Sequence, residues 1–476
     1  MSISVCIFED KKFSNFFPLS LAQGVFDLRI GCGTLRSRLL EGLPRPRQSL
    51  ICREYLAGVL ALSDGGPAVN QPASGATLFL NGRLLCFGDE RARLLEQLTD
   101  DTIAVKGGYV VGARLGKASA ADFSDYLRRR VGEDYLQEVA TALQRAGQVA
   151  PAAPKKRRPT RSSSPARGTY EDAHTLGQDD VEEKISLDLE RLIETARLRR
   201  IEMPEARLLS FPWQLIEFNG DAIADDFASS PVRGQADDCV VYGGVQIVRP
   251  EDVVIGERAV VRAGVVLDAS DGPIVIADGA LVMPNATIVG PVSVGRGAIV
   301  KTGAKILPGT SIGPVCKVGG EVEETIFAAY ANKQHDGFLG HSYIGEWVNI
   351  GAASNNSDLK NNYSPVRMWC AGSERETGRQ FLGLLMGDHT KTGINTLFNT
   401  GTVVGFNCNV FSSEMPAKFL PSFSWGHGEV MSRYDLEKAM QTASVVMERR
   451  QVKFTAAHRA VFEKISELSE RTDGNV

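Results

Sequence analysis

A six-residue repeat of aliphatic residues dominates the second half of the chain. From 276 to 322 an isoleucine or valine returns at every sixth position, and a small or slim residue follows four positions later. The aliphatic positions are Ile276, Val282, Ile288, Val294, Val300, Ile306, Ile312 and Val318. A helix repeats near 3.6 residues and a half-buried strand near 2. A period of six with turn residues inside each unit instead predicts a left-handed parallel β-helix of hexapeptide repeats.

The same register returns later in the chain, at 344–350 and 386–410, and begins near 255. We therefore expect the coil to occupy 240–412, with interruptions near 324–343 and 357–385. Loops that leave a rigid solenoid often carry function. A purely structural rod, such as an ice-binding protein, is the alternative, although it would have little use for two large excursions.

The first half of the chain has the pattern of an α/β domain, which we assign to 1–145 and 180–235. Strands are predicted at 5–8 and 77–80, strand pairs at 103–115, and helices at 35–40, 91–98, 121–145 and 181–200. A connector at 211–220 is expected to dock on this domain. At 430–470 an amphipathic helical pair should pack on the coil or a neighbouring chain. Membrane binding is disfavoured there because acidic residues interleave with the basic ones.

Residues 146–179 differ from everything around them, with Pro and Ala followed by Lys155, Lys156, Arg157 and Arg158. Such a composition cannot bury a core, which predicts a disordered basic linker. A nucleic-acid contact or a nuclear address is the alternative reading of the basic tract.

The bulk composition excludes several classes of protein. A net charge of -4 and a pI near 6.0 argue against general binding to nucleic acid or to a membrane surface. Neither a membrane span nor a signal peptide is visible, so we expect a cytoplasmic protein. The eight cysteines include no CxxC pair, and Cys316 and Cys408 fall at inward repeat positions, as buried thiols would. The six histidines have no metal-ligand spacing, so no metal site is predicted.

The segment 330–351 carries the strongest chemical signal. His335 lies between repeat blocks, beside Lys333 and Asp336. A histidine can take up a proton from an attacking nucleophile near neutral pH. On its own, an exposed loop histidine is more often simply a polar surface residue.

Two bacterial families share motifs with this segment. Residues 335–352 resemble, without a gap, the acetyltransferase half of the bifunctional enzymes that make UDP-N-acetylglucosamine. The likeness is closer to a divergent branch, the GlmU-like sugar nucleotidyltransferases, through 332–349, 387–395 and 399–402. That branch also shares short motifs at 17–19, 27–31, 81–83 and 217–220. The resemblance implies an α/β nucleotidyltransferase-like domain of Rossmann type, fused to an acyltransferase coil with a helical tail.

The resemblance assigns roles in the coil. His335 falls on the general base that deprotonates the sugar amine, and Asn349 falls on a sugar-binding asparagine. Lys333 would help to place the sugar phosphate, and Phe338 stands where the family usually has tyrosine. In the second excursion Asp358, Lys360 and Tyr363 would close over the same site and help to hold acetyl-CoA. His389, Lys391 and Asn395 are candidates for the cofactor groove, with His389 also a rival for the base.

The phosphate-binding motif of the first domain is altered. The family's first strand runs into a glycine loop whose backbone N–H groups approach nucleotide phosphates. Here the strand runs into Glu9 and Asp10, and a partial Gly-x-Gly echo follows only at 31–33. The candidate nucleotide contacts are Lys11, Arg29, Asn81 and Arg83, for UTP or another nucleoside triphosphate with Mg²⁺.

The leading hypothesis is therefore a transferase that moves an acetyl group from acetyl-CoA to a hexosamine phosphate or nucleotide sugar. One alternative is a sugar-1-phosphate nucleotidyltransferase whose coil serves mainly for trimerisation. A non-enzymatic alternative is a pseudoenzyme that binds nucleotide sugars. The resemblance also implies a homotrimer, with acetyl-CoA bound between neighbouring coils.

Overall fold

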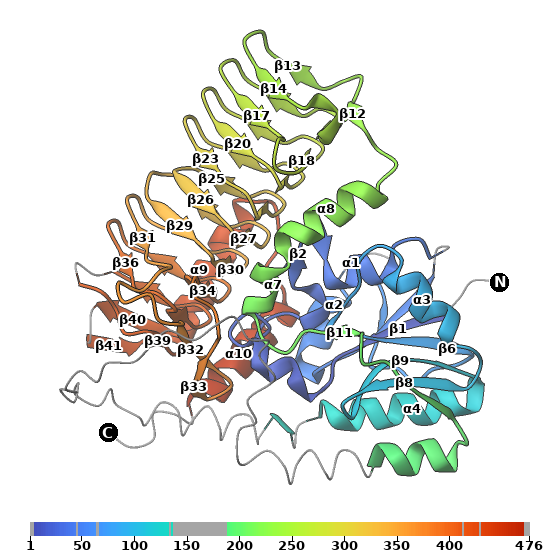
Figure 1. Ribbon diagram of the computed structural model, residues 1–476. Coiled ribbons are helices and arrows are strands. Elements are labelled where there is room, and N and C mark those ends of the chain that lie inside the picture. The colour runs from blue at the N-terminus through green and yellow to red at the C-terminus, as the bar shows by residue number, and fades with distance from the viewer. Residues whose placement is uncertain are drawn as a thin grey trace, which may run out of the picture.

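The computed structural model describes residues 4–43, 46–62, 66–132, 135–136, 188–411, 414–427 and 430–470. The basic linker predicted at 146–179 lies outside these residues. Figure 1 shows an α/β domain beside a tall coil of stacked strands, with the C-terminal helices at the base of the coil.

The α/β domain is built on a seven-stranded sheet in the order β10-β8-β9-β6-β1-β4-β5. Its strands are β1 (Ser4–Phe8), β4 (Arg47–Ile51), β5 (Ala68–Val69), β6 (Thr77–Asn81), β8 (Thr102–Lys106), β9 (Tyr109–Leu115) and β10 (Arg199–Glu202). Helices α1 (Leu35–Leu40), α2 (Ala57–Leu60), α3 (Glu90–Gln97) and α4 (Lys117–Arg130) connect and cover these strands. The parallel pairs β6-β1-β4-β5 give the Rossmann-type half of the sheet that was predicted. The helix predicted at 181–200 extends too far, because its last residues belong to β10.

The second half of the chain is a left-handed parallel β-helix with three faces. The first face is a ten-stranded sheet made of β12 (Gly234–Gln235), β15 (Val253–Ile255), β18 (Ile274–Ile276), β21 (Val292–Val294), β24 (Thr310–Ile312), β27 (Ile326–Phe327), β30 (Tyr343–Ile344), β34 (Leu385–Met386), β37 (Val403–Val404) and β39 (Phe419–Leu420). The second face holds β13 (Val240–Val241), β16 (Val260–Val261), β19 (Leu281–Val282), β22 (Ile299–Val300), β25 (Lys317–Val318) and β28 (Asn332–Lys333), then β35 (Lys391–Thr392), β38 (Asn409–Val410), β40 (Ser424–His427) and β41 (Val430–Arg433). The third face holds β14 (Gln246–Val248), β17 (Val266–Asp268), β20 (Thr287–Val289), β23 (Lys305–Ile306), β26 (Glu321–Glu323) and β29 (Phe338–Gly340), then β31 (Asn355–Asn356) and β36 (Leu397–Phe398).

The aliphatic repeat positions fill the inside of this prism, as predicted. From Ile276 to Val318 all eight are 0% exposed, and so are the small positions Ala280, Ala286, Ala298, Ala304 and Cys316. Cys316 and Cys408 are free, buried thiols. The hydrophobic effect therefore fixes the register of the coil at almost every turn.

The first predicted interruption, at 324–343, is wrong, because β27 to β30 continue the three faces without a break. Ile276 pairs with Val294, a turn of 18 residues. Ile312 pairs with Phe327, and Phe327 with Ile344, so these two turns are 15 and 17 residues long. The shortened turns shift the six-residue register, which makes a continuous coil look broken in the sequence.

The second predicted interruption, at 357–385, does leave the coil, but it lies in a different place from the one predicted. Its hairpin, β32 (Arg367–Cys370) and β33 (Ser373–Glu376), lies against the α/β domain. Val366, Met368 and Cys370 are buried in the core of that domain, and the Cys370 thiol donates a hydrogen bond to the Asn15 carbonyl at 3.1 Å. The excursion therefore joins the two domains.

The connector at 211–220 forms α7 (Trp213–Glu217) and the start of α8 (Asn219–Ser229). The buried Asn219 side chain accepts hydrogen bonds from the Gly31 N–H at 2.8 Å and the Ser311 hydroxyl at 3.0 Å. Its own amide donates to the Gly309 carbonyl at 2.8 Å. One side chain thus ties the connector, the α/β domain and the first face together.

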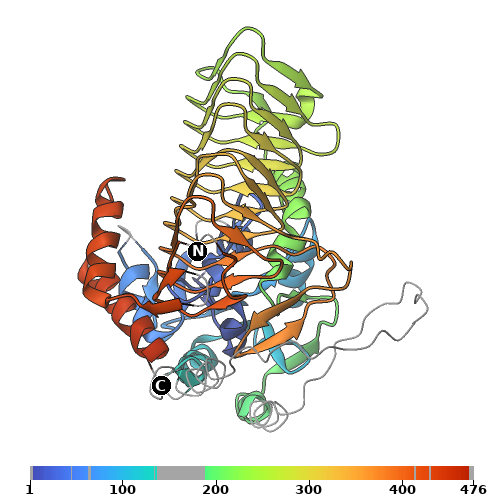
Figure 2. The same cartoon turned by 90° about the vertical axis from the view of Figure 1, so that its left-hand side faces the viewer.

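The predicted helical tail consists of α9 (Leu436–Glu448) and α10 (Ala456–Glu470). Its apolar stripe, including Met440, Ala443, Met447, Phe462 and Ile465, is buried. Figure 2 shows both helices beside the lower coils and the α/β domain. Among the described residues, no helix has the length and hydropathy that a membrane span requires.

Candidate active site

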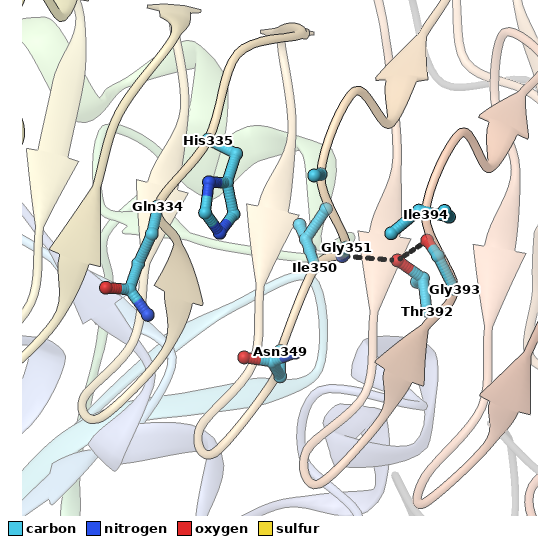
Figure 3. A pocket seen from close by; sticks show the side chains of 9 residues that line it. Gln334, His335, Asn349, Ile350, Gly351, Thr392, Gly393 and Ile394 are labelled. Carbon is cyan, nitrogen blue, oxygen red and sulfur yellow. Dashed lines mark hydrogen bonds between the residues drawn. The ribbon is translucent and has the colours of Figure 1, made fainter.

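An open pocket lies on the prism edge between the second and third faces. It has a volume of about 330 Å³ and is lined by Gln334, His335, Asn349, Ile350, Gly351, Ala352, Thr392, Gly393 and Ile394. His335 is exposed at the corner between β28 and β29, and Asn349 comes from the next coil, where it bridges to Asn332. Figure 3 shows the two side chains on neighbouring coils, with Asn349 lower in the view than His335. The structure therefore brings together His335 and Asn349.

The lower wall of the pocket is held by close contact between successive coils. The Gly351 N–H donates to the Thr392 hydroxyl at 2.9 Å, and that hydroxyl donates to the Gly393 carbonyl at 3.3 Å (Figure 3). A Cβ at position 351 would lie 2.1 Å from the Gly393 oxygen, so only glycine fits. Gln334, Thr392 and Ile394 were not anticipated from the sequence, although the return of the six-residue register at 392 places that residue next to Ile350.

Lys333 does not line this pocket, and its predicted contact with a sugar phosphate is wrong. Its side chain is 2% exposed and lies inside the prism, because β28 pairs with β25 and puts it below Val318. The ammonium donates to the carbonyl oxygens of Gly319 and His335, both at 3.0 Å. Burial lowers the pKa of Lys333 to about 8, partly offset by Asp336. Lys333 thus fixes the backbone corner that carries His335.

The predicted cofactor groove at His389 is also wrong. His389 points out of the coil but is 5% exposed, with its ring parallel to Trp347 and edge-on to Phe462 of α10. Burial, and then the neighbouring Lys391, hold its pKa well below the usual range. Lys391 donates to the His389 carbonyl at 2.8 Å, and Asn395 is exposed with its backbone bonded to Ala352. The prediction of a groove failed because α10, in the helical tail, packs over this part of the second face.

The remaining predicted contacts gather on the third face, away from the pocket lining. The Asp358 carboxylate accepts a hydrogen bond from Nδ1 of His341 at 2.8 Å. A Cβ at Gly340 would lie 2.3 Å from Asp358 and 2.5 Å from the Phe338 ring, so these two side chains meet over Gly340. Lys360 bonds to the Pro365 carbonyl in its own loop, and Tyr363 is 67% exposed. The lid that was predicted over His335 is therefore not formed by these residues.

At the carboxyl edge of the α/β sheet, the polar side chains bind one another. Asp10 caps the 3₁₀ helix Lys11–Phe16 through the Lys12 N–H at 3.1 Å. The same carboxylate accepts hydrogen bonds from Asn81 at 2.8 Å and from Nε of Arg83 at 2.7 Å. Burial alone would raise the pKa of Asp10, but Arg83, Asn81 and Lys12 together hold it below the usual range. The side chains of Asn81 and Arg83, which were predicted to contact a nucleotide, are therefore already engaged in hydrogen bonds to Asp10.

The neighbouring charges are occupied in the same way. Glu9 and Arg53 are both 0% exposed and form a double hydrogen bond of 3.0 Å on each arm. The Arg29 N–H donates to the Tyr343 hydroxyl of the coil at 2.8 Å, so Arg29 belongs to the domain interface. Lys11 lines a cavity of only about 40 Å³, with Tyr109 and Arg130 among its neighbours.

These observations test whether a nucleoside triphosphate with Mg²⁺ fits the α/β domain. The glycine loop is replaced by a capped 3₁₀ helix, and the side chains of Asn81, Arg83 and Arg29 already donate hydrogen bonds within the protein. The cavity at Lys11 has room for only a few water molecules. The described residues at this edge do not fit such a ligand. The pocket at His335 is different, since it is open, lies on the surface and has a proton acceptor at its rim.

Three comparisons relate this chain to known proteins. Residues 5–152 match the family described as "Sugar nucleotidyl transferase". "Bifunctional protein GlmU" of Methanocaldococcus jannaschii is 35% identical over 93 residues, 20% of this chain and 22% of that protein. The "Bifunctional sugar-1-phosphate nucleotidylyltransferase/acetyltransferase" of Sulfurisphaera tokodaii is 30% identical over 91 residues, 19% and 23% of the two chains.

A solved structure titled "UDP-N-acetylglucosamine acyltransferase from Campylobacter jejuni" covers 50% of this chain and 82% of its own, at 18% identity and a TM-score of 0.23. The chain spans under a quarter of the length of the two curated relatives. The chain is therefore similar over part of its length to bifunctional nucleotidylyltransferase/acetyltransferases, and its residues 5–152 match the sugar nucleotidyl transferase family.

Proposed function

We propose that the β-helix transfers an acetyl group from acetyl-CoA to the amine of a hexosamine phosphate or nucleotide sugar. The observation that carries this proposal is the pocket that His335 and Asn349 line together from successive coils. The name of the Sulfurisphaera tokodaii relative, which includes acetyltransferase, supports the same chemistry.

In this reaction the amine nitrogen attacks the thioester carbonyl and a C–N bond forms. His335 takes the proton that the nitrogen loses, as a general base at the pocket rim. The C–S bond then breaks, and the thiolate of coenzyme A leaves and takes up a proton. Asn349 holds the sugar through its amide, which can both donate and accept hydrogen bonds.

No nucleotidyl transfer step is proposed, because the carboxyl edge of the α/β sheet does not fit a nucleoside triphosphate. This weighs against the alternative in which the coil serves only for trimerisation. We also propose a homotrimer, which the resemblance of the coil to the acetyltransferase family implies and which would be a closed cyclic assembly. A monomeric mass in light scattering at micromolar concentration would contradict that part.

The experiment is to incubate the protein with acetyl-CoA and a panel of amino-sugar phosphates and nucleotide amino sugars, and to measure free thiol. His335→Ala should lower turnover by roughly 10²–10⁴-fold. Its melting temperature should stay unchanged, because His335 is exposed at a corner of the coil. His341→Ala is the matched control, a histidine outside the pocket lining. Equal activity of both variants and the wild type would refute the role of His335.

A further inference from the structure

A group of four cations lies on the second face, one step from the pocket. We call it the cation cluster, and it consists of Lys301, Lys317, Arg449 and Arg450. The two lysines come from coils above the pocket, and the two arginines follow the last turn of α9. Arg450 donates a hydrogen bond to the Asn332 side chain at 2.9 Å, which docks the end of the helix on the coil.

The cation cluster has no acidic partner in the part of the chain that the structure describes. None of its members forms an ion pair within 4.0 Å with a described Asp or Glu. Burial lowers the pKa of Lys317, and Arg450, Lys301 and Arg449 lower it further, in that order. The carboxyl end of α9 supplies only about half a negative charge. Four full charges therefore remain largely uncompensated.

Two rows of outward positions connect the cation cluster with the pocket. In the first row Lys317 pairs with Asn332, and Asn332 bridges to Asn349, which lines the pocket. Neighbouring strands are about 4.8 Å apart, so Lys317 and Asn349 are separated by roughly 10 Å of backbone.

The second row runs over a glycine. A Cβ at Gly319 would lie 3.0 Å from Cβ of Lys301 on one side and 2.6 Å from the Gln334 carbonyl oxygen on the other. Gln334 lines the pocket beside His335. Lys301, Gly319 and Gln334 therefore follow one another closely on successive coils, and Gly319 places no side chain between Lys301 and the pocket.

We propose that the cation cluster binds a phosphate or diphosphate group of the substrate that reacts at the His335 pocket. Unpaired lysines and arginines on a shared surface are the groups that bind phosphate oxygens, arginine with two parallel hydrogen bonds. An anion here restores the charge balance that the protein leaves open. The inference rests on the proposed function for the identity of the pocket, and the binding itself does not depend on turnover.

Two kinds of substrate carry this chemistry: the acceptor, as a sugar phosphate or nucleotide sugar, and the acyl-CoA donor. The sources are distinguished by titrating the full-length protein with UDP, with 3′,5′-ADP and with inorganic phosphate in a calorimeter. Preference for UDP assigns the cation cluster to the sugar nucleotide, and preference for 3′,5′-ADP assigns it to coenzyme A. Inorganic phosphate alone should bind more weakly than the preferred nucleotide.

Lys317→Met and Arg450→Met should each weaken binding of the preferred probe by about tenfold or more, as loss of a charge-assisted hydrogen bond does. Arg262→Met is the matched control, because Arg262 lies on the same face and already bonds to the Tyr242 hydroxyl. It changes the net charge equally and should leave binding unchanged. Added salt should weaken binding to the wild type more than to Lys317→Met.

Failure of this inference can be separated from failure of the proposed function. No binding of any probe at millimolar concentration, or equal binding by Lys317→Met, Arg450→Met and Arg262→Met, would overturn the cation cluster. His335→Ala should bind the probes as the wild type does. If the probes bind as described and no acetyl transfer is detected, the inference stands and the proposed function falls.

Discussion

The carboxyl edge of the α/β sheet and the His335 edge of the β-helix both gather charged side chains, yet they use them differently. At the first, Glu9 pairs with Arg53 and Asp10 with Arg83, and all four are largely buried. At the second, His335 is exposed and the cation cluster has no acidic partner in the described residues. Charges that satisfy one another hold a fold together, whereas charges left open to solvent are available to a ligand.

The strongest way to test this contrast is to break the Glu9–Arg53 pair. Glu9→Gln leaves a fully buried guanidinium without its counter-charge, which costs about 3–5 kcal/mol of unfolding free energy. Chemical denaturation measures the loss. Glu437→Gln is the control, since its pair with Arg459 is exposed and contributes at most about 1 kcal/mol.

If the edge were instead a phosphate site, Glu9→Gln would cost little stability and would strengthen nucleotide binding. That outcome would reverse the assignment of the two edges.

The second test compares two histidines of the coil, His389 and His335. His389 is buried against Trp347 and Phe462, so His389→Ala should open a cavity and cost about 2–4 kcal/mol. Acetyl transfer per folded molecule should not change. His335→Ala should instead lower acetyl transfer and leave the stability unchanged. Loss of acetyl transfer in His389→Ala, with stability intact, would show that the buried ring takes part in the chemistry.

Much of the fold could be predicted from the sequence, because the inside of a prism tolerates only certain side chains. Ile276 to Val318 keep one register, and all of these positions are buried. The register could not reveal the turns of 15 and 17 residues, in which the same inward space is filled by Phe327 and Lys333 at shifted positions. A lysine in that space reads in the sequence as a loop residue.

The site was predicted only in part for a similar reason. His335 and Asn349 are close in sequence and one coil apart, so the repeat itself brings them together. Arg450 reaches Asn332 from a separate helix, 118 residues away, and no periodic pattern encodes that contact. The burial of His389 under α10 is likewise a property of tertiary packing. Contacts between the tail and the coil could therefore not be predicted from the sequence pattern.

The finest test of the contrast is Lys333, a charge that the protein buries inside the coil without an acid at hydrogen-bond distance. Its pKa is lowered to about 8 from an ordinary value of 10.5, mainly by burial. The folded state therefore holds this proton less tightly than the unfolded state does. The penalty is fully present below pH 8 and fades as the pH rises toward 10.5.

Lys333→Met should remove that penalty and also the two hydrogen bonds to Gly319 and His335. Since one unit of pKa corresponds to about 1.4 kcal/mol and each hydrogen bond contributes about 1 kcal/mol, the net gain at pH 7 is on the order of 1 kcal/mol. The gain should shrink between pH 8 and 10.5, measured as the difference from the wild type in denaturant. The difference is the proper quantity because the buried thiols, such as Cys316 with a pKa raised to about 12, make the same pH-dependent contribution to the stability of both proteins.

Lys453→Met, at an exposed position, is the control and should show no such trend. Lys391 has its pKa lowered to about 8 by burial as well, so Lys391→Met should show the same pH window. A Lys333→Met protein that is less stable than the wild type at every pH would mean that the two carbonyl contacts outweigh the buried charge. Lys333 would then belong with the paired charges of the α/β domain, and the distinction between the two edges would rest on the cation cluster and His335 alone.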